Sequence, residues 1–363
     1  MTSLWSVSGL ATGLDWRKII DELMAIERRP ITALEQRKSR LEAVKKAWSD
    51  VKLALQAVDT RLDPLFLSTT FRARVAVSSA EAVVKGTAST GAPTGTYAIS
   101  VEKLAQAQVV ASDPQPVDAT FSGDVMIGTE GGTTTTITVS GCLTDVASAI
   151  NNARVGVSAS VVATDGTNGV LVLKSSTTGL NGKMVLDGGL LVTLGVLEPD
   201  GNGGYVPKHQ VVEAQDAKFT VDGAAVTSGS NTVTTAVPGV TLELKGVGSA
   251  TLEVKADVDS MVARIRDFVN AYNDALSKLR SYLVNQPGNA GPFAGDATAQ
   301  AIERQLRELV YGAVSGLPSD MDSLYDLGIS TTDKTGALAI DETKLREALS
   351  VRAGDVANLF YSA

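Results

Sequence analysis

Two stretches of seven-residue hydrophobic repeat, one near each end of the 363-residue chain, constrain its fold more than any other feature. In both stretches apolar residues recur at alternating steps of three and four, the spacing that gathers them on one face of an α-helix. Most positions between them are charged, so each helix has one face to bury. The apolar positions are Leu34, Leu41, Val44, Trp48, Val51, Leu55, Val58, Leu62 and Leu65 in the first stretch, and Val262, Ile265, Val269, Tyr272, Leu276, Leu279 and Leu283 in the second.

The first repeat predicts two helical pieces, 15–28 and 31–65, because Pro30 disfavours helix in the residue before it. The second repeat predicts a helix from position 258, with another over 298–314. We expect the two apolar faces to pack as an antiparallel pair, because the segment between them joins the end of one to the start of the other. With Trp48 buried in this seam, its truncation to alanine would cost about 3 to 5 kcal/mol. An ordinary helical bundle is compatible with the same spacing, although the length of the repeat favours an exposed rod.

From about position 66 to 257 the composition changes to Val, Thr, Ser, Gly and Ala in short alternating runs. Runs such as TYAISVEKL and VTLELKG, separated by Asp-Gly and Asn-Gly turns, predict β-strands. The stretch LTDVASAINNA at 143–153 has apolar residues at helical spacing and Asp145 in its first turn, which predicts a helix. The fold class is therefore α+β and multidomain, with a helical, coiled-coil-like leg formed by the N- and C-terminal segments and β-rich head domains inserted between them.

These changes of pattern divide the chain into four parts. The N-terminal helical segment, 1–35, is set apart from a helical leg domain made of 36–70 and 259–363. A β-rich head domain is expected from 71–107 and 214–258. A second, outer head domain, β-rich with one helix, is expected from 108–213.

The sequence carries few groups suited to catalysis or metal binding. The single cysteine, Cys142, is expected to be a small buried thiol, and the single histidine, His209, an exposed loop residue. The DKTG sequence at 333–336 lacks the oxygen ligands of a calcium loop and predicts a hairpin turn, after which Asp341 caps a helix that starts at Glu342. We therefore expect no cofactor, no metal site and no enzymatic activity.

Charge and hydropathy exclude further classes of protein. The formal net charge of −8 provides no basic field, which disfavours nucleic acid as a partner. No apolar run approaches the roughly 20 residues of a transmembrane helix, so no membrane span is expected. The charged residues among the first 30 positions also distinguish the N-terminus from a cleavable secretory signal.

The N-terminal residues carry a family pattern. The stretch SGLATGLDWRKIIDELMAIERRPITALEQRKSRLEA resembles the start of bacterial flagellar filament cap proteins, the flagellar hook-associated protein 2 family. In that family a Gly-rich turn precedes a helix ending in E-R-x-P and then a long heptad helix. Three later stretches, beginning at Gly95, Ala214 and Phe268, resemble the family in the same order. The matching N-terminal positions are Gly9, Gly13, Leu14, Asp15, Leu23, Glu27, Arg28 and Pro30.

The resemblance implies a structural cap at the distal end of the bacterial flagellar filament. It implies a homo-oligomeric ring of about five subunits that retains exported flagellin and promotes its folding and insertion. The implied partners are other copies of the chain, flagellin, neighbouring hook-associated proteins and an export chaperone. The implied location is extracellular, at the flagellum tip, after export through the flagellar type III pathway guided by an uncleaved N-terminal segment. Family members continue beyond the equivalent of Phe360 into a further helical segment, so we expect the partner of residues 1–35 to lie outside this chain.

Other functions remain compatible with the residues. A surface adhesin, with a β head on a coiled stalk, has the same pattern and would be favoured by glycan binding to residues 108–213. Other flagellar axial proteins share single pieces of the resemblance. A secreted enzyme would need titratable groups converging in a cleft, which a single histidine and scattered acidic residues do not provide.

Overall fold

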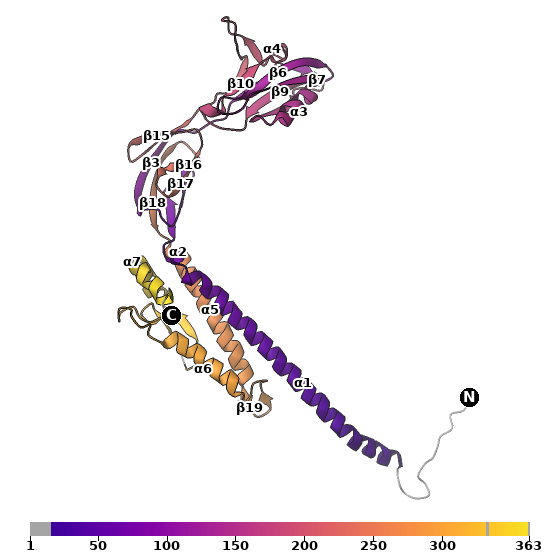
Figure 1. Cartoon of the computed structure of the whole chain (residues 1–363), viewed down its shortest axis with the longest axis vertical. Coiled ribbons are helices and arrows are strands. Elements are labelled where there is room, and N and C mark those ends of the chain that lie inside the picture. Colours follow the sequence, from indigo (N-terminus) through magenta and orange to yellow (C-terminus); the bar gives the residue numbers. More distant parts are fainter. Residues whose placement is uncertain (1–15, 332–333, 362–363) are drawn as a thin grey trace, which may run out of the picture. The chain divides into compact units, whose positions relative to one another are not determined.

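A computed structural model of the chain describes residues 16–331 and 334–361, which fall into two compact units (Figure 1). The leg unit combines the residues up to Arg72 with those from Val258 onward, and the head unit comprises Ala73–Asp257. Helices and strands are both abundant, and a long N-terminal helix is present. These features confirm the predicted α+β fold class.

The leg unit is mainly helical. Its long helices are α1 (Trp16–Leu62), α5 (Val258–Leu283), α6 (Ala297–Tyr311) and α7 (Glu342–Tyr361). Short elements connect them: η1 (Asp63–Phe66), α2 (Ser68–Phe71), β19 (Asn285–Gln286), β20 (Asn289–Ala290), β21 (Ile329–Thr331) and β22 (Leu338–Ile340).

The prediction that Pro30 separates two helices is wrong, because α1 runs through it without interruption. A proline inside a helix leaves the carbonyl four residues earlier, here that of Ile26, without its N–H donor. The side chains of α1 around this point are exposed, so water can reach that carbonyl. The strong helix formers on both sides therefore continue one helix across the proline.

The start of α7 agrees with the sequence. Asp341 caps the helix, since its Oδ1 accepts hydrogen bonds from the backbone N–H groups of Thr343 at 3.1 Å and Lys344 at 3.2 Å. Strands β21 and β22 pair antiparallel before it, and Gly336 in the turn between them has φ +79°. The expected DKTG turn begins at Asp333, which lies outside the described residues.

The head unit contains two hydrophobic cores. The first lies between a five-stranded antiparallel sheet and a three-stranded one, and its largest buried side chains include Ile99, Phe219 and Leu252. In spatial order the larger sheet consists of β1 (Arg74–Ser78), β18 (Gly248–Ala256), β3 (Gly95–Lys103), β14 (Ala217–Val221) and β15 (Ala224–Ser228). The smaller sheet consists of β16 (Thr232–Val237), β17 (Val240–Leu244) and β2 (Val84–Ala88).

The second core is formed by residues between Val110 and Leu197. One sheet holds β10 (Met184–Asp187), β6 (Phe121–Thr129) and β7 (Thr135–Gly141). The other holds β13 (His209–Val212), β4 (Val109–Ala111), β9 (Asn168–Ser175), β5 (Gln115–Pro116) and β8 (Val157–Ala163), and β11 (Leu197–Pro199) forms a hairpin with β12 (Tyr205–Pro207). The helical pieces are α3 (Leu143–Ala153), η2 (Leu180–Gly182) and α4 (Gly189–Thr193). Because the head forms one compact unit, its division at 107 and 214 stays a prediction.

The prediction of a helix over 143–153 is confirmed by α3, but the prediction that Cys142 is buried is wrong. Cys142 is the half-exposed N-cap of α3. Its backbone N–H donates to Asp145 Oδ2 at 2.9 Å, and its Sγ lies 3.1 Å from the same oxygen. A residue at an N-cap lies at the helix entrance, where the chain reaches the surface, so its small size did not lead to burial.

His209 is exposed, as expected, but it begins strand β13 and does not lie in a loop. Its Nε2 lies 2.7 Å from Asp113 Oδ1, and Lys208 Nζ donates to Asp113 Oδ2 at 2.6 Å. These hydrogen bonds, that of Lys208 first, lower the pKa of the Asp113 carboxyl. Lys208 and His209 therefore both hold Asp113, in the loop after β4.

Candidate assembly surface

Helices α1 and α5 of the leg unit pack side by side in antiparallel directions. Asp50 of α1 accepts a hydrogen bond from the hydroxyl of Tyr282 at 2.7 Å, near the end of α5. Arg61, later in α1, lies 3.6 Å from Asp267, earlier in α5. Positions that increase along α1 thus meet positions that decrease along α5, which is the pairing expected from the sequence.

The first heptad repeat is covered only over its second half. Val51, Val58 and Leu65 are buried, the last of them in η1, after the end of α1. Val44, Trp48, Leu55 and Leu62 are half-buried. Leu34 and Leu41 are 65% and 61% exposed, because α5 is much shorter than α1 and ends before it reaches them (Figure 1).

In α5 the second repeat is buried almost completely. Val262, Ile265, Val269, Tyr272, Leu276 and Leu279 are buried and Leu283 is half-buried. Met261, Phe268 and Ala275 between them are buried as well. The buried surface of α5 is therefore wider than a two-helix seam, since α1, α6, α7 and β22 all contact this helix. Where α1 packs on α5, the leg is therefore a helical bundle. The first half of α1 is an exposed rod.

The heptad pattern did not point to Phe293, which is fully buried in the turn before α6. Its ring lies 4.5 Å from that of Trp48 and 5.6 Å, edge to face, from that of Tyr282 (centroid distances). Ala47 of α1 and Ala299 of α6 complete this small core. Small residues at those two positions let α1 and α6 approach the aromatic group closely. Phe293 is the one aromatic residue between Tyr282 and Tyr311, which is the signal that could have indicated it.

Polar groups of α5 hold the hairpin β21–β22. The side-chain amide of Asn273 donates to the carbonyl of Leu338 at 2.9 Å and accepts from the N–H of Leu338 at 2.8 Å. It thus makes the two hydrogen bonds that a neighbouring strand would make. Two turns further along α5, Arg280 donates to the carbonyl of Thr335 at 2.6 Å. The buried hydroxyl of Tyr272 lies beside them, and its burial raises its pKa to about 12. This tyrosine therefore stays neutral over the physiological pH range.

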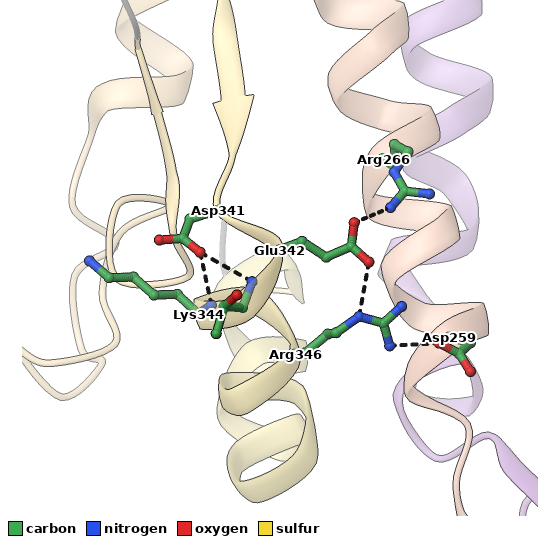
Figure 2. A network of polar contacts seen from close by, with 7 residues as sticks. Asp259, Arg266, Asp341, Glu342, Lys344 and Arg346 are labelled. Carbon is green, nitrogen blue, oxygen red and sulfur yellow. Dashed lines mark hydrogen bonds and ion pairs between the residues drawn. The ribbon is translucent and has the colours of Figure 1, made fainter.

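An ion-pair network joins α5 to α7 (Figure 2). Glu342 bridges two arginines: Arg346 Nε donates to its Oε1 at 2.9 Å and Arg266 Nη2 to its Oε2 at 2.6 Å. Arg346 in turn donates to Asp259 Oδ1 at 2.6 Å. The hydrogen bond from Arg346, with the charge of Arg266, lowers the pKa of Glu342. A single exposed ion pair contributes little to the free energy of folding. This network therefore acts mainly by fixing the orientation of α7 on α5.

We expect Glu342→Gln to weaken the leg unit at neutral pH and to have no effect in acid. A carboxyl whose pKa is lowered by folding stabilises the fold above its unfolded pKa, and this contribution is lost as the pH falls through the folded pKa. The difference in urea midpoint between the two proteins should therefore shrink to zero as the buffer becomes acidic. Glu347→Gln, on an exposed part of the same helix, is the matched control. A difference that persists unchanged in acid would contradict the assignment.

The first half of α1 presents an unpartnered apolar face. Seven large apolar side chains in the described part of this half are about half to two-thirds exposed. Exposed apolar residues in such number along one helix favour an interaction surface. They are Ile20, Leu23, Met24, Ile26, Ile31, Leu34 and Leu41.

The same helix differs in charge from the rest of the chain. The sequence of α1 contains eleven Lys and Arg against seven Asp and Glu, whereas the chain as a whole carries a net charge of −8. Arg37, Lys38 and Lys45, with one acidic residue, Glu42, flank Leu34 and Leu41 along a shallow groove of the exposed half. An apolar stripe bordered by basic side chains favours an amphipathic helical partner with acidic flanks.

Only some residues of the N-terminal family pattern lie in the part of the chain that the structure describes. Leu23, Glu27, Arg28 and Pro30 lie on the exposed half of α1. Gly9, Gly13, Leu14 and Asp15 lie outside the described residues. The structure thus brings the second half of the first repeat together with the second repeat, and places Leu23, Glu27, Arg28 and Pro30 on the uncovered half of α1.

Within residues 16–331 and 334–361, no group of three or more His, Cys, Asp or Glu side chains could hold a metal ion. No helix in the same ranges is long and apolar enough to cross a membrane. The most distinctive feature of the leg is helix α1, with one half packed and the other half exposed.

Comparisons with known proteins agree on one family. Residues 12–108 match the sequence profile of the flagellar hook-associated protein 2 N-terminus, and residues 214–363 that of its C-terminus. The flagellar hook-associated protein 2 of Escherichia coli K12 is 32% identical over 99% of this chain and 80% of its own length. The B-type protein of Pseudomonas aeruginosa PAO1 is 31% identical over 86% of this chain and 71% of its own. The crystal structure of domains D1-D2-D3 of the flagellar cap protein FliD from Escherichia coli has a TM-score of 0.69, with 30% identity, covering 86% of this chain and 89% of that one.

Proposed function

Since the chain belongs to the flagellar hook-associated protein 2 family and is a cap protein of the bacterial flagellar filament, we propose that its copies form a ring that retains exported flagellin and promotes its folding and insertion. The observation that carries this proposal is the half-covered helix α1. A cap subunit has to be folded by itself and still offer a surface to neighbouring chains, and α1 meets both needs along one helix.

The buried half of α1 anchors the helix. Val51 and Val58 pack against α5, and the hydrogen bond between Asp50 and Tyr282 fixes the register of the two helices. The exposed half then projects as a continuation of a well-packed element, so its position is defined without contacts of its own. We assign this exposed half to contacts with other subunits of the flagellum.

The proposal includes location, partners and the absence of catalysis. The relatives of this chain are cap proteins of the flagellum, which is an extracellular structure, and they are structural proteins. We propose that this chain reaches the filament tip by the flagellar type III pathway, with 1–35 as export and anchor segment and an export chaperone before secretion. The same proposal includes a ring of about five copies, with flagellin and hook-associated proteins as its neighbours. It also includes the absence of enzymatic activity.

Deleting the gene in the source bacterium tests this function. We expect cells with bare hooks and with monomeric flagellin in the medium, because subunits that leave the channel are no longer retained. Electron microscopy of the cells and immunoblotting of the medium measure the two effects, and expression of the chain from a plasmid should reverse both. Normal filaments in the deletion strain would refute the cap function.

A further inference from the structure

The chain contains three Asn-Gly pairs, at Asn168, Asn181 and Asn202, all in the head unit. Asn followed by Gly is the pair most prone to spontaneous deamidation, because glycine lacks the Cβ that would hinder attack by its backbone nitrogen. The folded structure decides which pairs can react, since the attacking nitrogen must be free and the side-chain amide must be able to approach it.

Two of the pairs are held in place by the fold. The side chain of Asn168 donates to Asp165 Oδ2 at 3.0 Å, and Gly169 is buried in β9 between its partners in β8 and β5. The N–H of Gly182 donates to the carbonyl of Gly179 at 2.9 Å. Gly182 is also buried against Thr177, so neither segment can rearrange without local opening.

Asn202 lies in the exposed loop between β11 and β12. The carboxylate of Asp200 holds this loop, accepting from the N–H of Asn202 at 2.7 Å and from that of Gly204 at 2.8 Å. Among the residues described, the N–H of Gly203 and the side chain of Asn202 have no hydrogen-bond partner. Nothing lies within 4 Å of the space that a side chain on Gly203 would occupy. Gly203 is also exposed, so the reacting nitrogen is both unpaired and accessible.

We propose that Asn202 is a site of spontaneous deamidation in the folded protein. The backbone nitrogen of Gly203 gives up its proton to solvent base and attacks Cγ of Asn202. The new N–Cγ bond closes a succinimide ring, and the Cγ–Nδ2 bond breaks with release of ammonia. A water molecule then adds to one of the two ring carbonyls, and ring opening yields aspartate or isoaspartate at position 202.

The neighbouring Asp200-Gly201 pair could form the same ring, but from a protonated carboxyl. The hydrogen bonds that Asp200 accepts from Asn202 and Gly204 favour its ionised form and lower its pKa. Both hydrogen bonds are accepted by Oδ1, which holds the carboxylate on the N–H groups of Asn202 and Gly204. The reaction is thus directed to Asn202.

The modification changes the surface of the head. It adds a negative charge two residues from Asp200, and isoaspartate also inserts an extra methylene into the backbone. Both effects weaken the hydrogen bonds that Asp200 accepts and that shape the loop. The hairpin that presents the exposed side chains of Tyr205 and Val206 would then change conformation with the age of the molecule.

The experiment incubates the full chain in mildly alkaline H₂¹⁸O, folded or in urea, followed by trypsin digestion and mass spectrometry. The three pairs fall in separate peptides, Val155–Lys174, Ser175–Lys183 and Met184–Lys208. In the folded protein we expect labelled deamidation of Met184–Lys208, placed at residue 202 by fragment ions, and rates about tenfold or more lower for the other two peptides. In urea the three rates should become similar.

Asn202→Gln is the control variant, because its longer side chain would have to close a less favourable six-membered ring. It should abolish labelling of Met184–Lys208 in the folded protein and leave the other two peptides unchanged. The proposal is overturned if folded Val155–Lys174 or Ser175–Lys183 reacts as fast as Met184–Lys208, or if the label lies at Asp187 or Asp200. These outcomes do not bear on the cap function, which the gene deletion tests independently.

Discussion

Replacing Phe293 by alanine is expected to lower the free energy of unfolding of the leg unit by about 3 to 5 kcal/mol. The ring is fully buried and contacts the rings of Trp48 and Tyr282, so its removal leaves a cavity between α1, α5 and the start of α6. The rigid helices around it cannot collapse into this space. Trp48 is only half-buried, so Trp48→Ala is expected to cost less than the roughly 3 to 5 kcal/mol that its burial would have implied.

Trp48 itself can report the unfolding of this part of the molecule. With Trp5 and Trp16 replaced by phenylalanine, Trp48 is the sole tryptophan, and its fluorescence during a urea titration follows the core around Phe293. Tyr325→Ala, which truncates an aromatic residue of the leg that is 70% exposed, serves as control. Equal urea midpoints for Phe293→Ala and Tyr325→Ala would show that Phe293 does not support the leg.

Leu41→Asp is expected to abolish filament growth while leaving the chain as stable as before. Leu41 is 61% exposed in the single chain, so a carboxylate there should change the free energy of unfolding by less than about 0.5 kcal/mol. In an assembled cap the same carboxylate would be buried against an apolar partner surface without a counter-ion, which strongly disfavours assembly. Swimming motility and filament number in the complemented deletion strain measure the result.

Leu53→Asp provides a matched control for this experiment. Leu53 belongs to the same helix and is also 61% exposed, but it lies in the half of α1 that packs on α5 and faces away from that contact. We expect this variant to support normal filaments. If Leu41→Asp also supports normal filaments, the exposed half of α1 is not an assembly surface, and the function must reside elsewhere.

The sequence predicted those parts of the fold in which local pattern and packing agree. Helix α3 followed from four apolar positions at helical spacing and from Asp145, and all four are buried. The strands of the head followed from period-two alternation, and Asp222-Gly223 forms the expected tight turn, with both residues at positive φ. Pro30 was misjudged because a local preference was applied to a helix whose exposed carbonyl water can satisfy.

The candidate site was harder to predict, since a repeat shows which residues share a face and not which of them are covered. Leu34 and Leu55 occupy equivalent heptad positions, yet one is exposed and the other is half-buried against its neighbours. The difference arises from the length of α5, which is a property of a segment more than 200 residues away. Phe293 escaped notice for a similar reason, because no periodic pattern surrounds a residue in a turn.

The two ends of the head unit lie on neighbouring strands. β1 and β18 pair antiparallel with Arg74 opposite Ala256, and the N–H of Asp257 donates to the carbonyl of Ala73 at 3.0 Å. The chain therefore enters and leaves this unit through points about 5 Å apart, the spacing of paired strands. An insert closed at its base in this way can lengthen, shorten or exchange its distant parts without moving the two ends that join the helices. Such modularity would let the head diverge to suit a new environment while the helical part stays constrained by its partners.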